Sequence, residues 1–119
     1  MKKIYVCTNR DGTSETIRKA KECCAFVAKI CGAIPIAPHI YFTQFLEDNV
    51  PEEKAFEALA GLQLLSECDE LWYFGDRISK GMVQEIVAAK EQNIRVRYVS
   101  ENELKDLLSR KGGIKYVQL

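Results

Sequence analysis

The sequence predicts an α/β protein: a three-layer α/β/α sandwich, flavodoxin- or Rossmann-like, with a parallel sheet of four to five strands. Short runs rich in β-branched and aromatic residues alternate with stretches whose apolar residues recur every three or four positions. This alternation is typical of a parallel sheet covered by helices. The chain has 119 residues, so residues 1–119 are expected to form one domain with a single core.

The first half of the chain contains two expected strands and one long helix. The first strand covers residues 3–8, and the helix that follows covers 13–31. A second short strand is expected over 33–37, where Pro35 indicates a position near the sheet edge. Residues 38–49 show no helical period and are rich in aromatic residues, so we expect a long loop there.

Residues typical of helix starts predict where the helices begin in the second half of the chain. Pro51 fits a first helical position, and the acidic residues after it suit a first turn. Ser100 and Glu103 match a capping box. The expected elements are a helix over 51–67, a central strand over 70–74, a helix over 80–92, a strand over 94–99, a helix with Leu104, Leu107 and Leu108 toward the core that ends at Gly112 and Gly113, and a possible final strand over 114–119.

Composition excludes several classes of function. Seventeen basic residues balance seventeen acidic ones, which gives no general attraction to long nucleic acid or to an anionic membrane. No apolar run is long enough to cross a bilayer, and no signal peptide is expected. The five cysteines form no CxxC pair, which favours a reducing cytoplasm over a disulfide framework, and Cys24 and Cys31 share an apolar helical face.

The topology predicts where a ligand site lies. In an open parallel sheet, ligands bind outside the carboxyl ends of the strands. Polar residues follow the expected strands at 8–12, 37–39, 75–77 and 100–101. The acidic pair at 69–70 precedes a strand, so it is expected at the opposite rim in a solvated or structural role.

The first of these loops joins a strand to the start of a helix. Backbone N–H groups and the helix dipole favour an anion there, and Arg10 adds positive charge. Only one glycine, Gly12, is present, so the loop is neither a dinucleotide-binding nor a Walker motif. Contact with phosphate or sugar and a simple Asp–Gly turn capped by Thr13 both remain open.

Glu85 is the residue of greatest chemical interest. Helical geometry puts Met82, Ile86 and Ala89 on one apolar stripe with Glu85 at its margin, near a helix start at the ligand rim. A carboxylate in that place is partly desolvated and able to contact a ligand. The alternative is an exposed glutamate on a surface helix, which periodicity alone favours.

Asp76 follows the central strand directly and is expected to face Glu85 across the cleft. Two carboxylates at a sugar-sized site can divide the roles of nucleophile and acid. The alternative is a turn or cap residue, because Gly75 and Ser79 flank it.

The remaining candidates are aromatic residues and the single histidine. His39 lacks a second histidine or a suitable cysteine beside it, so no metal site is expected. Tyr41, Phe42 and Phe45 suit either stacking on a base or covering the sheet edge, and Trp72 is expected in the core.

Residues 68–76 followed by 79–89 resemble the nucleoside 2-deoxyribosyltransferase-like superfamily, which includes deoxynucleoside monophosphate N-glycosidases. In that superfamily an aspartate follows the central strand, and a Gly-Thr-x-x-Glu-x-Gly-x-Ala helix start carries the nucleophilic glutamate. Gly81, Glu85 and Ala89 match this pattern.

Two positions depart from the pattern, since Met82 replaces the threonine and Val87 replaces the second glycine. These departures weaken the inference of activity more than the inference of fold. Residues 4–7 and 9–12 resemble the first strand and the substrate loop of the superfamily, and residues 34–42 together with 74–82 resemble a largely uncharacterised bacterial and phage branch.

The resemblance implies that Glu85 attacks the anomeric carbon of a deoxyribosyl group, and that Asp76 orients the sugar or protonates the leaving base. It further implies that the first loop holds the sugar hydroxyl or a 5′-phosphate. The expected substrate contacts are Thr8, Asn9, Arg10, Asp11, Gly12, His39, Tyr41, Gly75, Ser79, Gly81 and Met82.

The implied partner is a small nucleoside or nucleotide, with no cofactor. A homo-oligomer is also expected, with Leu59, Leu62 and Leu65 as a candidate interface. The rival is a non-catalytic module that binds a nucleotide or nucleotide derivative in the same cleft. A flavodoxin-like redox protein is disfavoured, because the first loop lacks a Ser/Thr-rich phosphate cradle.

Overall fold

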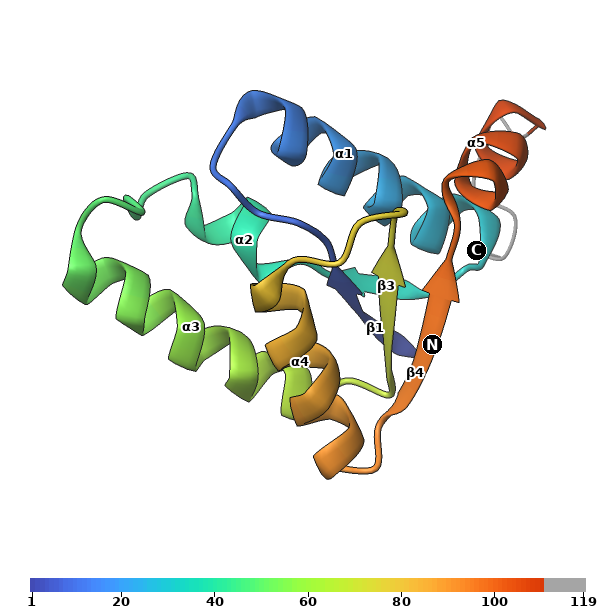
Figure 1. Cartoon of the computed structure of the whole chain (residues 1–119). Coiled ribbons are helices and arrows are strands. Elements are labelled where there is room, and N and C mark those ends of the chain that lie inside the picture. Colours follow the sequence, from blue (N-terminus) through green and yellow to red (C-terminus); the bar gives the residue numbers. More distant parts are fainter. Residues whose placement is uncertain (111–119) are drawn as a thin grey trace.

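The computed structural model describes residues 1–110 and contains a four-stranded parallel sheet covered by helices on both faces (Figure 1). The strand order is β2-β1-β3-β4. The strands are β1 (Lys3–Cys7), β2 (Ile34–Ile36), β3 (Glu70–Phe74) and β4 (Arg95–Val99). The predicted α/β class and parallel sheet are confirmed, with β2 at an edge and β3 inside the sheet.

Helices connect every pair of successive strands. They are α1 (Ser14–Ala25), which continues as the π-helical turn η1 (Phe26–Ile30), α2 (Pro38–Phe42), α3 (Pro51–Ser66), α4 (Lys80–Glu91) and α5 (Glu101–Arg110). The expected helix end at Gly112–Gly113 and the possible strand over 114–119 lie outside the described residues.

Alternate residues of the strands pack into two separate cores. One core lies against α1, η1 and α5 and includes Ile4, Val6, Phe26, Trp72, Phe74 and Leu104. The other lies against α3 and α4 and includes Tyr5, Cys7, Leu65, Leu71, Met82 and Ala89. The period of two along β1 therefore sends Tyr5 and Cys7 toward α4, where the candidate site lies.

Two expectations about local structure were wrong. The segment over 38–49 is not entirely loop, because it begins with α2. Pro38 occupies the start of that helix, where its missing N–H costs nothing, and five residues are too few to show a helical period. The expected helix over 13–31 also changes to a π-helical turn at Phe26.

Side-chain caps stabilise the starts of three helices at the carboxyl edge of the sheet. Thr13 Oγ1 accepts from the backbone N–H of Thr16 at 3.3 Å, and Ser79 Oγ accepts from that of Met82 at 3.3 Å. Ser100 Oγ likewise accepts from the N–H of Glu103 at 3.1 Å. The caps place the first turns of three helices beside the loops that follow the strands.

The opposite rim carries the acidic pair expected there. Asp69 Oδ2 accepts from the backbone N–H of Lys3 at 2.7 Å. Glu70 accepts from Lys2 Nζ at 2.7 Å and from Trp72 Nε1 at 2.9 Å. Both acids therefore have a structural role, which is one of the two roles expected for them.

The strand order reverses between β1 and β3, because the chain moves from β1 outward to β2 and then returns to the other side of β1. This is the switch point at which ligands bind in open α/β sheets. Within the described residues, none of the helices is long and apolar enough to cross a membrane.

Candidate functional site

Glu85 lies at this switch point, on the second turn of α4, and is 7% exposed. Its Oε2 accepts a short hydrogen bond from the Tyr5 hydroxyl and a second bond from Arg10 Nη2 at 2.8 Å. Its Oε1 accepts from Cys7 Sγ at 3.4 Å. The exposed alternative for Glu85 is therefore wrong, and the strand-end rule located the residue correctly.

The three donors around Glu85 are held in their protonated forms. Burial raises the pKa of the Tyr5 hydroxyl and of the Cys7 thiol, and the negative charge of Glu85 raises both further. Both groups therefore stay protonated and donate to the carboxylate. Burial opposes the charge of Arg10, but Glu85 and Glu57 outweigh that effect and raise its pKa. The site holds a buried carboxylate with three donors on it.

Arg10 joins Glu85 to a second carboxylate. Its Nη1 lies 3.6 Å from Oε1 of Glu57, a residue of α3 that is 6% exposed. Burial raises the pKa of Glu57, Arg10 lowers it, and Asp48 raises it, with a net upward shift. The two carboxylates therefore differ: three donors contact Glu85, whereas Glu57 has a longer ion pair and an acidic neighbour.

The sequence interpretation missed Glu57. The signal for it is the spacing of four residues from Glu57 to Gly61 and on to Leu65, the three positions that α3 buries. An acid on that stripe must enter the protein.

A cavity of about 560 Å³ lies beside these groups. The first loop, α2, α3 and the start of α4 all contribute to its wall. The lining residues are Asn9, Arg10, Asp11, Gly12, Thr16, Ile17, His39, Thr43, Asp48, Lys54, Glu57, Ala58, Ser79, Lys80, Gly81 and Gln84. Seven of the expected substrate contacts are thus brought together around one space.

His39 forms part of that wall and is buried. Its Nε2 lies 3.1 Å from Thr8 Oγ1. Burial, and then the charge of Arg10, lower the pKa of His39 to about 4. At neutral pH the imidazole is therefore uncharged and suited to hydrogen bonding at the cavity wall.

Gly12 and Gly81 shape the cavity in different ways. Gly12 has φ +79°, and a Cβ there would lie 3.1 Å from Asp48 Oδ2, so only glycine fits the turn without strain. A Cβ on Gly81 would have no atom within 4 Å. Gly81 therefore opens space one helical turn before Glu85.

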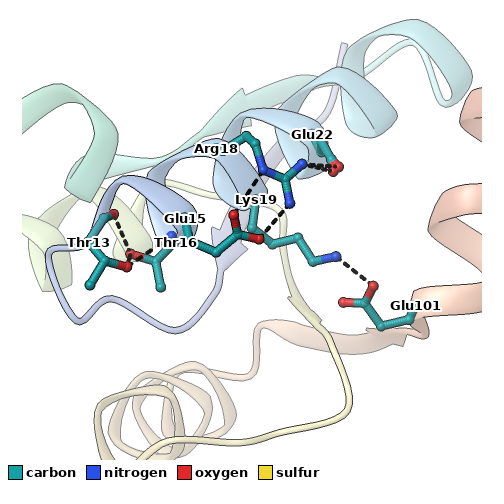
Figure 2. Close-up of polar contacts among 7 residues, drawn as sticks. All are labelled: Thr13, Glu15, Thr16, Arg18, Lys19, Glu22 and Glu101. Carbon is teal, nitrogen blue, oxygen red and sulfur yellow. Dashed lines mark hydrogen bonds and ion pairs between the residues drawn. The ribbon is translucent and has the colours of Figure 1, made fainter.

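A second cavity, of about 320 Å³, adjoins the first. Thr8, Gly75 and Asp76 line it, while Asn9 and Thr16 line both cavities. Figure 2 shows that Lys19 of α1 reaches Glu101 at the start of α5, and the two side chains, 2.5 Å apart, form another part of its wall.

Asp76 lines this second cavity, and its hydrogen bond is with Tyr98 rather than with Glu85. Its Oδ1 accepts from the Tyr98 hydroxyl at 2.9 Å. The described structure therefore pairs Glu85 with Arg10 and, through it, with Glu57, while Asp76 stands on the neighbouring wall.

Three other predicted contacts have local roles. Asp11 Oδ1 accepts from the Thr13 hydroxyl at 2.7 Å and from the Thr16 hydroxyl at 2.9 Å, which holds the loop against α1. Met82 is 1% exposed and packs in the core, because it is on the inner stripe of α4. Tyr41 lines a separate surface cavity.

The aromatic cluster and the leucine face each contain both exposed and buried side chains. Tyr41 is 59% exposed and packs edge-on against Phe42 and Phe45. Leu65 of the candidate interface lies in the chain's own core, whereas Leu59 and Leu62 are exposed. Trp72, Cys24 and Cys31 pack in or against the core, as expected.

Among the residues that the structure describes, no group of three or more His, Cys, Asp or Glu side chains is arranged to hold a metal ion. All five cysteines lie within these residues as free thiols.

Fold and site together define a Rossmann-like α/β protein with a buried carboxylate at the switch point of its sheet. Residues 2–99 match the family described as a domain of unknown function, DUF7768, and the chain belongs to that family. No curated protein matches the chain significantly.

Seven chains of solved structures match. One is a 2-deoxyribosyltransferase from the psychrotolerant bacterium Bacillus psychrosaccharolyticus, with a TM-score of 0.63 and 20% sequence identity. The match covers 82% of this chain and 72% of that chain. This likeness confirms the fold that the sequence resemblance implied.

Proposed function

We propose that this protein cleaves or transfers the N-glycosidic bond of a nucleoside or nucleotide, with Glu85 as the nucleophile. The observation that carries the proposal is the buried Glu85 carboxylate, held by Tyr5, Cys7 and Arg10 at the switch point. The adjoining cavity of about 560 Å³ suits a small ligand. The shared fold with a 2-deoxyribosyltransferase supports the same reaction class.

In the proposed reaction, an oxygen of Glu85 attacks C1′ of the sugar while the C1′–N bond breaks. The bonding electron pair goes to the base, which takes up a proton, and the sugar remains as an ester on Glu85. Oε1 is the better attacking atom, because its donor is the weak Cys7 thiol. Oε2 then becomes the ester carbonyl, on which Tyr5 and Arg10 already converge.

A second acceptor completes the cycle. Water, or the nitrogen of another base, attacks C1′ and releases the Glu85 carboxylate. Attack by water gives hydrolysis, and attack by a base gives transfer of the sugar.

Arg10 contacts Oε2 at 2.8 Å and also lines the cavity that a ligand would occupy. A sugar hydroxyl or a 5′-phosphate in the cavity would compete for its guanidinium. Its side chain is 29% exposed, which leaves it room to move. Asp76 contacts the same ligand from the second cavity, through the shared boundary at Asn9.

The test is an incubation of purified protein with 2′-deoxynucleosides and their 5′-monophosphates, followed by chromatography of the free base. Glu85→Gln keeps the shape of the side chain and removes the nucleophile. We expect base release to fall by at least about 10³-fold in this variant.

The matched control is Glu91→Gln, the same chemical change at an exposed position of the same helix. This variant is expected to keep wild-type turnover. Unchanged base release in Glu85→Gln would rule out the proposed nucleophile.

A non-catalytic nucleotide-binding module is the second candidate. The ion pair of Arg10 with Glu85 favours it, because the cation neutralises the carboxylate in the unliganded chain. Met82 and Val87, which replace the threonine and glycine of the superfamily pattern, also favour it. A rise in melting temperature with deoxynucleoside monophosphates, without release of base, would support this second candidate.

A further inference from the structure

Glu57 is a buried acid that lines the cavity beside the proposed nucleophile, and the reaction described above does not use it. It belongs to α3 and pairs with Nη1 of Arg10, whereas Glu85 pairs with Nη2. We propose that Glu57 is the acid that protonates the leaving base, and this inference rests on the proposed function of Glu85.

Geometry supports this role. Glu57 Oε1 lies 3.6 Å from Arg10 Nη1, which is an ion-pair distance and longer than a hydrogen bond. Its carboxyl group therefore keeps acceptor and donor capacity toward the cavity that it lines. Arg10, which lines the same cavity, forms ion pairs with both carboxylates.

The environments of the two carboxylates differ in the direction that the reaction requires. Glu85 accepts from Tyr5, Cys7 and Arg10, which stabilises its negative charge. Burial and the charge of Asp48 raise the pKa of Glu57, against the lowering effects of Arg10 and Lys54. The raised pKa of Glu57 suits the role of an acid, and the hydrogen bonds on Glu85 suit that of a positioned nucleophile.

Asp76 is less well placed to supply the proton. Its carboxylate lines the neighbouring cavity and accepts from the exposed Tyr98 hydroxyl. Glu57, in contrast, is 6% exposed and lines the cavity beside Glu85.

The proton balance is complete. The Glu57 carboxyl gives its proton to a ring nitrogen of the base as the C1′–N bond breaks, and it becomes a carboxylate. The base leaves neutral, and the sugar is bound to Glu85. Glu57 then removes a proton from the incoming water or base as that group attacks C1′, which restores both side chains.

The first test needs no activity. In ¹³C NMR of glutamate carboxyl groups in the wild-type protein, we expect Glu57 to titrate above the ordinary glutamate range. The groups that set this value are Arg10, Asp48 and Lys54. A Glu57 carboxyl that titrates at or below the ordinary value overturns the proposal, whatever the protein catalyses.

The second test compares two leaving groups, 2′-deoxyguanosine and 7-methyl-2′-deoxyguanosine. The methylated base is already cationic and leaves without an added proton. We expect Glu57→Gln to lower kcat/KM on 2′-deoxyguanosine by about 10²-fold or more, and on the methylated substrate by less than about 10-fold. Glu57→Asp, which retains an acid, is expected to recover part of the first loss.

The control is Glu52→Gln, an exposed position on the same helix, with wild-type rates expected on both substrates. Equal losses on both substrates in Glu57→Gln would mean that Glu57 only anchors Arg10, which overturns the acid role alone. A leaving-group-dependent loss in Asp76→Asn instead would also overturn it. Wild-type protein that releases no base from either substrate overturns the proposed function, and the acid role falls with it.

Discussion

Arg10 Nη2 lies 2.8 Å from Glu85 Oε2, although the two residues are 75 positions apart in the chain. This ion pair ties the loop after β1 to the second turn of α4, across the switch point of the sheet. It stabilises the carboxylate and also covers it, so stability and activity are expected to respond differently when the pair is changed.

Arg10→Ala is expected to destabilise the fold. It leaves Glu85 buried without its cation, and breaking a partly exposed pair of this kind costs about 2 kcal/mol. Urea unfolding at neutral pH measures the change. Arg18→Ala is the control, because Arg18 pairs with Glu15 and Glu22 on the exposed surface of α1 (Figure 2) and should matter little. Equal losses in both variants would contradict a special role for Arg10.

Tyr5→Phe tests the other donor on Glu85. The variant keeps the ring in the core and removes one hydrogen bond to a charged acceptor, which is expected to cost roughly 1.5–3 kcal/mol. Tyr98→Phe is the matched control, since its hydroxyl donates to Asp76 at an exposed position. If the free energy of unfolding of Tyr5→Phe equalled that of the wild type, the Tyr5–Glu85 bond would have no energetic weight.

His39 predicts a dependence of stability on pH. Its pKa is lowered from 6.5 to about 4 in the folded chain, so the unfolded state binds the proton more readily between these values. Stability should therefore fall as the pH drops from about 6.5 toward 4, by an amount on the order of 3 kcal/mol from this residue.

The difference between wild type and His39→Gln isolates this effect from the titration of carboxylates. Because His39 is the only histidine in the chain, its NMR titration is also unambiguous. A His39 pKa near the ordinary value, or an identical pH dependence in the variant, would refute the prediction.

Substitutions at Gly81 test the role of the cavity separately from the stability of the fold. Gly81→Ala should leave the fold intact or stabilise it by roughly 0.5 kcal/mol, because the helix gains a better residue and the added Cβ meets no atom within 4 Å. Gly81→Leu should fold equally well and weaken nucleotide binding by occupying the cavity. Thermal melting with and without a deoxynucleoside monophosphate measures both effects. Undiminished ligand protection in Gly81→Leu would place the ligand elsewhere.

The fold was largely predictable because its signals are local. The strand over 70–74 was predicted with its observed bounds, and Pro35 correctly indicated an edge strand. The short helix α2 was not predicted, because a five-residue segment cannot display a helical period. No sequence pattern indicated the π-helical turn at the end of α1.

The site was predictable only in part. The strand-end rule located Glu85, but its pairing with Arg10 depends on contacts between distant segments, which spacing does not reveal. The strand-end rule suggested Asp76 as the second carboxylate, whereas the acid that lines the cavity beside Glu85 is Glu57, from the middle of a helix. Its position on the stripe with Gly61 and Leu65 was the available signal.

The most direct test of the central claim is mass spectrometry of the protein quenched during turnover of a 2′-deoxynucleoside or its 5′-monophosphate. We expect a deoxyribosyl or deoxyribosyl-phosphate adduct on the peptide that contains Glu85, absent in Glu85→Gln and present in Glu91→Gln. Base release with no adduct on Glu85, or an adduct on another residue, would contradict that claim.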